Sequence, residues 1–499
     1  MSARLLIIGL DGADGRTLDS ASRNGTLRNL AALRARGCAW ALSSEQGTTD
    51  DSLWASFQYG TDVGEHGRYC YEIPGSSGQP GSAILAEDDR ETFWDKLSRR
   101  GSRVAAFDVP KCRRPRPLNG IHLADWLVHG RYFQPRPLAY PEDLADDVLT
   151  RFGAAPPSRC AYRPAALSDD EVLMVRDNLL RAVGQKHAAG LHYLSSESWD
   201  LFIIGFKEAH CGCHVFWEFA DPEHDKHDAS RVGHLGNPVL DILKKQDAAI
   251  GDLVKVAGAE ATVIVFSTSD FVPNGSIQHL LPGILHRLNR YMGMHFGERI
   301  LHALTEKGER LDRYVGMHVS ERILLAIRRL YRRISPPPVW SVSYSDNAGA
   351  LRVPRLRKES ASCYERRLDL IEALIRELVD TDDGLPVVPL VTRPAFEYTG
   401  KRAENLPHLL LHFRSNLCSS AVTSPRLGRI EAPRPSNIRS GNHKPGGFAF
   451  AIGPSASVAM AQVKSMKDFA EFAAKTLGPQ VPRTLEEVGR SAGETSMFP

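Results

Sequence analysis

The chain has 499 residues, of which 42% are hydrophobic and 24% charged, the composition of an ordinary globular protein. Its length predicts one large α/β body with insertions or a second lobe. The formal net charge of +3 is too small to indicate a nucleic-acid partner, and no run of about 18 apolar residues indicates a membrane span.

The N-terminal segment predicts a buried strand that ends in an acid. Residues 4–10 form an apolar run, and Asp11 follows it within the motif GLDG. The segment has no signal-peptide cleavage site, and the eight cysteines are scattered without a C-x-x-C pair. We therefore expect a cytoplasmic protein without a disulfide framework.

Residues 48–59, TTDDSLWASFQY, predict a helix that begins with hydroxyls and acids. The N–H groups and the dipole at such a helix start favour anions. Thr49 and Asp50 stand at this start, and Trp54 is a candidate core residue or wall of a substrate pocket.

Strands and helices then alternate, which predicts a mostly parallel sheet covered by helices on both faces. The interruption is a region rich in proline and arginine at 110–137, which predicts a surface loop. The expected strands are 38–42, 103–107 and 262–266, and the expected helices are 26–36, 91–100, 141–152, 169–184 and 239–256.

The stretch 200–217 joins a wholly apolar run to two histidines, His210 and His214, four residues apart. Side chains at i and i+4 share one face of a helix, so both imidazoles can converge on one cation. Two ordinary helix histidines are the alternative at this point. Cys211 and Cys213 are expected to point away from that face and to pack inside.

Two neighbouring features have weaker signals. Lys207, at the predicted strand end, is a candidate for contact with substrate. The histidine-rich loop at 221–234 could hold a metal, but a solvated turn is the favoured interpretation.

Residues 283–338 are helical in pattern, rich in arginine and closed by three prolines. They contain an internal echo, RYMGMHFGERILHAL against RYVGMHVSERILLAI, offset by 23 residues. We interpret them as an inserted helical cap or oligomerisation arm. The core would then comprise residues 1–282 and 339–499.

The last part of the chain returns to strands and helices. His443 lies in GNHKPGGFAFAIG, a glycine-rich loop that leads directly into an apolar strand. The other expected elements are strands near 347–353, 386–391 and 409–413 and helices at 364–379 and 466–477.

Four of these segments resemble motifs of the alkaline phosphatase superfamily, in its type I phosphodiesterase and nucleotide pyrophosphatase branch, and they occur in that family's order. They are LLIIGLDGAD, with the first metal-binding aspartate; DDSLWASFQYGTDVGEHG, the nucleophile-bearing helix; GFKEAHCGCHVFW, the D-x-x-x-H ligand pair; and GNHKPGGFAFAIGP, with a metal-binding histidine. The resemblance implies an alkaline-phosphatase-like α/β core around the helical insertion.

The resemblance also implies metal ligands. One family site corresponds to His210, His214 and His443, with a histidine where the family has its aspartate, and Asp11 corresponds to a ligand of the second site. Three neutral nitrogen donors suit a divalent transition metal. Zinc is the expected ion, with iron or manganese as alternatives.

The second metal site departs from the family. Thr268 and Ser269 occupy the positions of its Asp-His dipeptide, and Asp50 occupies the nucleophile position. The resemblance thus implies Asp50 as a candidate catalytic residue, and Thr49 or Ser52 could take its place only if the register slips. Asp50, Asp270 and the first-strand aspartate could still hold a hard cation, or the site is empty. Whether Asp50 is nucleophile, base or ligand stays open, and Asp270 is also a candidate for substrate contact.

The resemblance therefore implies a metal-dependent enzyme acting on a small anionic phospho- or sulfo-ester by hydrolysis or group transfer. A mononuclear lyase, transferase or oxidative enzyme of a specialised biosynthetic pathway is one alternative. A catalytically inactive binding or assembly protein is another. We expect no nucleic-acid or membrane partner, and a homo-oligomer through residues 283–334 is an option.

Overall fold

The computed structural model describes residues 3–45, 50–69, 90–112, 114–127, 136–157, 167–292, 339–342, 348–356, 358–415, 417, 419–434 and 439–478. The chain divides into two compact units. The first comprises Met1–Gly75, Gly81–Pro273 and Ser436–Pro499, and the second Ser76–Pro80 and Asn274–Pro435. Residues 339–435, which the sequence-based division assigns to the core, thus belong to the second unit.

The first unit is built on a nine-stranded sheet with the order β2-β16-β7-β1-β6-β3-β4-β5, and β15 pairs with β7 beside this path. Its central strands β7, β1, β6, β3 and β4 run parallel, whereas β2, β5, β15 and β16 pair antiparallel with their neighbours. The strands are β1 (Ala3–Asp14), β2 (Cys38–Ala41), β3 (Val104–Phe107), β4 (Gly120–Ala124), β5 (Leu138–Tyr140), β6 (Trp199–Phe206), β7 (Thr262–Pro273), β15 (Gly441–Lys444) and β16 (Phe448–Ile452).

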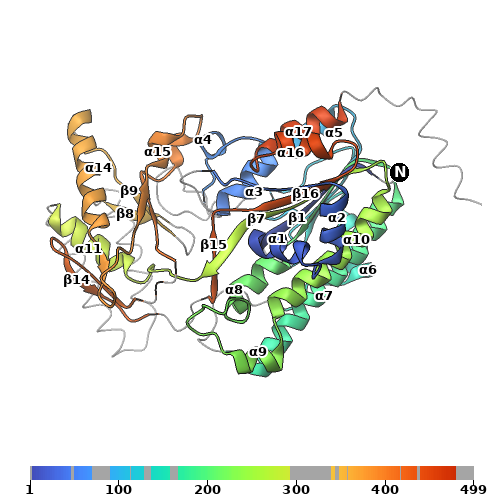
Figure 1. Cartoon of the computed structure of the whole chain (residues 1–499). Coiled ribbons are helices and arrows are strands. Elements are labelled where there is room, and N and C mark those ends of the chain that lie inside the picture. Colours follow the sequence, from blue (N-terminus) through green and yellow to red (C-terminus); the bar gives the residue numbers. More distant parts are fainter. Residues whose placement is uncertain are drawn as a thin grey trace, which may run out of the picture. The chain divides into compact units, whose positions relative to one another are not determined.

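Helices cover both faces of this sheet (Figure 1). Alternate residues of a strand point to opposite faces: Leu6 and Ile8 of β1 lie in one core cluster, and Leu5 and Ile7 in the other. The first cluster packs under α1 (Gly15–Arg23), α2 (Arg28–Arg36), α6 (Leu144–Phe152), α7 (Asp169–Ser196), α8 (Glu208–Ala220), α9 (Ala229–Leu235) and α10 (Pro238–Ala257), and the second under α3 (Asp50–Tyr59), α5 (Phe93–Arg99), α16 (Ala456–Gln462) and α17 (Asp468–Leu477). The short helix α4 (Val63–His66) follows α3.

Two elements correct the sequence-based expectation. The predicted surface loop at 110–137 is wrong in part, because it contains β4, whose residues Leu123 and Ala124 are fully buried. The surrounding prolines and arginines hide so short an apolar run. Helix α7 continues past Gly184, where the prediction stops it, since one helical glycine costs only about 1 kcal/mol.

The second unit has its own core and two small sheets, ordered β10-β13-β14 and β11-β12-β9-β8. Its elements are α11 (Leu281–Tyr291), β8 (Trp340–Val342), β9 (Ala348–Arg352), α14 (Ala361–Arg376), β10 (Val379–Asp380), β11 (Leu390–Thr392), α15 (Pro394–Glu397), the 3-10 turn η2 (Ala403–Asn405), β12 (Leu409–His412), β13 (Ala421–Ser424) and β14 (Gly428–Glu431). Most of the expected insertion, 293–338, lies outside the described residues. Within the part that the structure describes, no helix is long and apolar enough to cross a membrane.

Candidate metal centre

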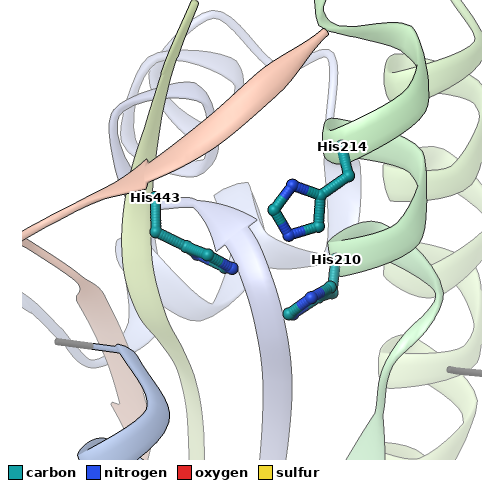
Figure 2. A group of neighbouring side chains, drawn as sticks. All are labelled: His210, His214 and His443. Atoms are coloured by element: carbon teal, nitrogen blue, oxygen red, sulfur yellow. The ribbon is translucent and has the colours of Figure 1, made fainter. Parts of the chain in front are cut away.

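Helix α8 and strand β15 bring three histidines together at the carboxyl edge of the central sheet (Figure 2). His210 and His214 lie one turn apart on α8, and His443 lies on β15, opposite Phe271 of β7. The ring centroids are 4.6 Å apart for His210 and His214, 4.7 Å for His210 and His443, and 4.8 Å for His214 and His443. The i,i+4 spacing alone left open a pair converging on a cation or two ordinary helix histidines. In the structure the two rings converge with a third, that of His443.

The chain before His443 runs directly along α8. The backbone N–H of Ser440 donates to the carbonyl of His214 over 2.8 Å. A Cβ atom on Gly441 would lie 2.3 Å from the carbonyl oxygen of Cys213 and 2.7 Å from Cβ of Trp217. Only glycine fits at this position, so the sequence GNH is suited to place a histidine beside the helix.

A second glycine permits the same closeness from the other side. Gly12, at the end of β1, has φ +58, and a Cβ there would lie 2.9 Å from Cα and Cβ of His210. A side chain would be strained by the backbone angle and would collide with the helix. The end of β1 can therefore pack against the first turn of α8, next to Asp11.

Two of the rings have their Nδ1 atoms engaged by outer groups. Nδ1 of His214 donates to the carbonyl of Gly441 over 2.8 Å, and Nδ1 of His443 lies 2.8 Å from the hydroxyl of Ser269. Because a carbonyl can only accept, His214 carries its proton on Nδ1 and has its lone pair on Nε2.

The third ring meets a carboxylate. Oδ2 of Asp11 lies 3.2 Å from Nδ1 of His210, and its Oδ1 accepts a hydrogen bond of 2.7 Å from the indole of Trp54. Metal-binding histidines typically direct their other ring nitrogen to a carboxylate, a carbonyl or another polar group. His214 and His443 make such hydrogen bonds, and His210 lies at ion-pair distance from its carboxylate, which favours Nε2 as the ligand nitrogen for a shared ion.

The donor set fits a transition metal. His210, His214 and His443 are buried, and one ligand nitrogen from each lies within 4.8 Å of the others. Burial, then the charge of Arg439, holds the pKa of His214 well below its usual value. The neutral imidazole is the form that binds metal, and three imidazole nitrogens suit zinc with an open coordination position.

The cysteines between the histidines do not join this set. Cys211 and Cys213 are fully buried in the core cluster under α8, as expected from their positions on the helix. Burial raises the pKa of the Cys213 thiol well above its usual value, which disfavours the thiolate needed for a metal ligand.

One residue at the centre escaped the sequence analysis. Nη1 of Arg439 donates to Nε2 of His214 over 3.2 Å. Arg439 lies outside every motif, and no spacing rule connects it with α8.

The positions of the family's second metal site make hydrogen bonds instead. The hydroxyl of Thr268 accepts from the backbone N–H of Gly12 over 3.2 Å, and the hydroxyl of Ser269 contacts His443. These side chains hold the end of β1 and one imidazole, which is a structural use of positions that carry ligands in the family's pattern.

The remaining sequence-predicted residues lie as follows. Asp50 is the first residue of α3, but its side chain and all of Thr49 lie outside the described residues. Trp54 is fully buried and binds Asp11. Asp270 lies against Gly15 and Gly446, and burial, followed by the charge of a neighbouring aspartate, raises its pKa.

Lys207 lies in a separate buried cluster where β6 leads into α8. Its Nζ is 2.9 Å from Oδ1 of Asp108, and Nζ of Lys186 is 2.7 Å from Oδ2 of the same carboxylate. Burial opposes ionisation, but the two lysines still lower the pKa of Asp108. Lys207 is thus committed to an internal ion pair.

Comparison with known proteins gives a family match. A model of the type I phosphodiesterase / nucleotide pyrophosphatase family matches residues 5–318. No curated protein matches the chain. Among solved structures, phosphonoacetate hydrolase from Sinorhizobium meliloti 1021 in complex with phosphonoformate has a TM-score of 0.51 at 12% identity, covering 95% of this chain and 96% of that one. Murine ectonucleotide pyrophosphatase / phosphodiesterase 5 has a TM-score of 0.49 at 10% identity, covering 98% and 99%.

Proposed function

This chain belongs to the type I phosphodiesterase / nucleotide pyrophosphatase family of metal-dependent hydrolases, and we propose that it acts on a small anionic phospho- or sulfo-ester at a mononuclear metal centre. His210, His214 and His443 would hold the ion, with zinc as the expected metal. Hydrolysis is the principal reaction in this proposal, and transfer to another acceptor is its variant.

One observation carries the proposal. Three buried imidazoles converge, and the Nδ1 atom of each contacts an outer group: Asp11 for His210, the carbonyl of Gly441 for His214 and Ser269 for His443. Such outer contacts fix the tautomer and the orientation of metal-binding rings. A cluster of core histidines without a ligand has no need of three matched partners.

The chain's own groups then have distinct tasks. A bound ion would supply Lewis-acid polarisation of the ester. Asp11 places a carboxylate 3.2 Å from Nδ1 of His210 and would orient that ring. Asp50 is the first residue of α3, and we assign to it the role of nucleophile or of general base.

Two observations favour an anionic substrate, a helix start and a structure of the same fold. The start of α3 lies in the chain's nucleophile motif, and a helix start of this kind favours an anion. The phosphonoacetate hydrolase of the same fold binds phosphonoformate, a small anionic phosphonate. Phosphonates therefore belong with phosphate and sulfate esters among the compounds to be tested.

A second candidate function rests on the hydroxyls at 268 and 269. These side chains make hydrogen bonds to Gly12 and His443, which supports a centre that holds one ion. A mononuclear lyase or transferase would need no second ion. The lyase or transferase function is favoured if one metal ion binds tightly and no ester in a broad panel is cleaved.

The test is metal loading followed by a substrate panel. Purified protein would be loaded with zinc, manganese or iron(II) and assayed on aryl phosphodiesters, phosphomonoesters, sulfate esters and phosphonates. His214→Ala should lose both the metal and the activity, whereas His234→Ala, at an exposed histidine, should keep both. A wild-type protein that takes up no transition metal would contradict the proposal.

A further inference from the structure

The strongest unassigned feature of the centre is the guanidinium at Arg439. Its Nη1 donates to Nε2 of His214 over 3.2 Å, and that is the nitrogen suited to the metal. The same lone pair cannot serve a metal and a guanidinium at once. Metal binding at His214 therefore requires Arg439 to exchange its hydrogen-bond acceptor.

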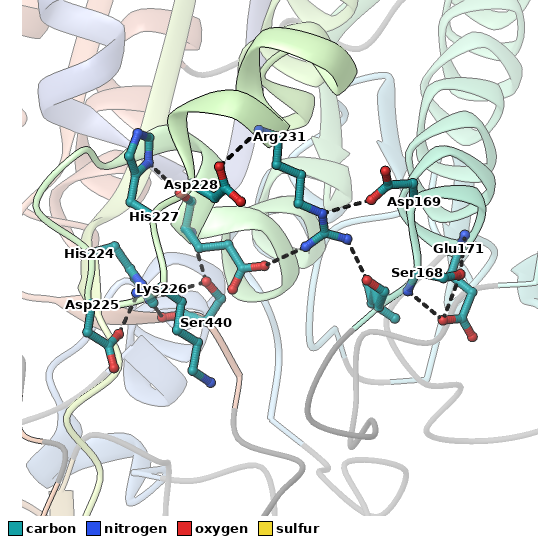
Figure 3. Close-up of polar contacts among 12 residues, drawn as sticks. Ser168, Asp169, Glu171, His224, Asp225, Lys226, His227, Asp228, Arg231 and Ser440 are labelled. Atoms are coloured by element: carbon teal, nitrogen blue, oxygen red, sulfur yellow. Dashed lines mark hydrogen bonds and ion pairs between the residues drawn. The ribbon is translucent and has the colours of Figure 1, made fainter.

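The backbone next to Arg439 is firmly held. Ser440 donates from its N–H to the carbonyl of His214 and accepts at its hydroxyl from the N–H of Glu218. Its carbonyl accepts from Nε2 of His224 over 3.1 Å (Figure 3). Helix α8 thus fixes the chain on one side and the turn carrying His224 on the other. The guanidinium can change partner while its main chain stays beside the histidines.

The expected new hydrogen-bond acceptor of Arg439 is an oxyanion of the substrate. Two-ion centres neutralise both the attacking and the leaving oxygens of a tetrahedral anion. Here Thr268 and Ser269 replace ligands of the second ion and are used in hydrogen bonds. A guanidinium supplies a permanent positive charge and a planar set of donors that match two oxygens of an oxyanion.

We propose that Arg439 is a substrate-binding residue of this centre. When Nε2 of His214 binds metal, the guanidinium of Arg439 leaves that nitrogen and donates to the oxyanion of the substrate. This inference rests on the mononuclear centre proposed above. Arg439 lies outside the family's motifs. In this inference its guanidinium supplies the positive charge that the second ion supplies in two-ion centres.

The inference predicts two effects of opposite sign. Arg439 competes with the ion for His214 and repels it, so removing the guanidinium should tighten zinc binding in the absence of substrate. The same change should weaken the binding of a tetrahedral oxyanion. A purely structural arginine, which only supports β15, would weaken both when it is removed.

The experiment measures both affinities on Arg439→Gln, Arg439→Lys and the exposed control Arg36→Gln. Zinc affinity would be measured by competition with a chromophoric chelator, and orthophosphate affinity by calorimetry on the zinc-loaded protein. Arg439→Gln should bind orthophosphate roughly 10- to 100-fold more weakly, the range for a lost charged hydrogen bond, and zinc at least as tightly as wild type. Arg439→Lys should fall between, because it keeps the charge and loses the fork.

The outcomes separate this inference from the proposed function. A wild-type protein that binds no zinc overturns both. Zinc binding by wild type, with orthophosphate affinity unchanged in Arg439→Gln and Arg439→Lys, overturns only the role of Arg439. Weaker zinc binding in both variants also overturns it, because it indicates support of the fold, and circular dichroism of each variant would establish that it is folded.

Discussion

The imidazole of His443, on strand β15, lies with its centroid 4.7 Å from that of His210, on helix α8, although the two are far apart in the sequence. The contact exists because β15 pairs with β7, and β7 pairs with β1 at the same edge of the sheet. A centre assembled from separate segments depends on each outer contact that fixes a ring. The predictions below test those contacts and the framework around them.

The carboxylate of Asp11 orients His210, so its removal should weaken metal binding without unfolding the chain. Asp11→Asn keeps an acceptor for the Trp54 indole but loses the negative charge beside Nδ1 of the histidine. We expect zinc affinity to fall about 10- to 100-fold, the usual effect of losing such a partner. Chelator competition measures it, and Asp177→Asn, at an exposed carboxylate, is the control. An unchanged zinc affinity would contradict the proposed role of Asp11 in orienting His210.

Close packing of the chain at Gly441 should make even a methyl group costly. In Gly441→Ala the new Cβ meets the carbonyl of Cys213, and we expect the free energy of unfolding to fall by about 1–3 kcal/mol. Gly184→Ala has open space around it on α7 and should stabilise the chain by up to about 1 kcal/mol. Denaturant unfolding compares the two, and equal effects would contradict the close approach.

Part of the fold and of the candidate site could be predicted from the sequence alone. The first strand, the histidine pair on its helix and the terminal histidine were predicted because each is a local pattern at a strand end. The family resemblance supplied their order, and the family match over residues 5–318 confirms the resemblance itself. The α/β fold with a mostly parallel central sheet is likewise confirmed.

Other features have no local signal. Arg439 reaches His214 only because β15 approaches α8, and Ser269 meets His443 only because β15 pairs with β7. Both contacts arise from strand pairing between distant segments. Strand β4 was missed for a different reason, since GIHLA is short and lies between proline- and arginine-rich stretches.

Lys186 should be essential to the junction of β6 and α8. Its ammonium is fully buried, contacts Asp108 at 2.7 Å and donates to the carbonyl of Gly205 over 2.6 Å. Lys186→Met leaves a buried carboxylate with one cation fewer, and we expect a loss of about 3–5 kcal/mol in the free energy of unfolding. Lys475→Ala, which breaks the exposed pair with Glu471, should change it by less than about 1 kcal/mol. A small effect of Lys186→Met would contradict the buried pair.

Glu45 should make stability depend on pH. Burial, partly offset by the hydroxyl of Ser56, raises the pKa of this carboxyl to about 7. Between pH 4.5 and 7 the native chain keeps a proton that the unfolded chain releases, so stability should fall as the pH rises through this window. The slope should approach about 1.4 kcal/mol per pH unit from this group.

Glu45→Gln isolates that contribution. The variant has no titrating carboxyl, so its free energy of unfolding should lose this slope and should exceed that of wild type at pH 8. Denaturant midpoints collected from pH 5 to 8 on both proteins measure the difference. A constant difference across that range would contradict the raised pKa.

The most direct test of the metal centre is X-ray absorption at the zinc edge of the loaded protein, combined with zinc content. We predict one zinc ion per chain, with histidine nitrogens at about 2.0–2.1 Å and no sulfur neighbour, and loss of the ion in His443→Ala. Sulfur scattering from Cys211 or Cys213, or full zinc content in His443→Ala, would contradict a centre held by the three imidazoles.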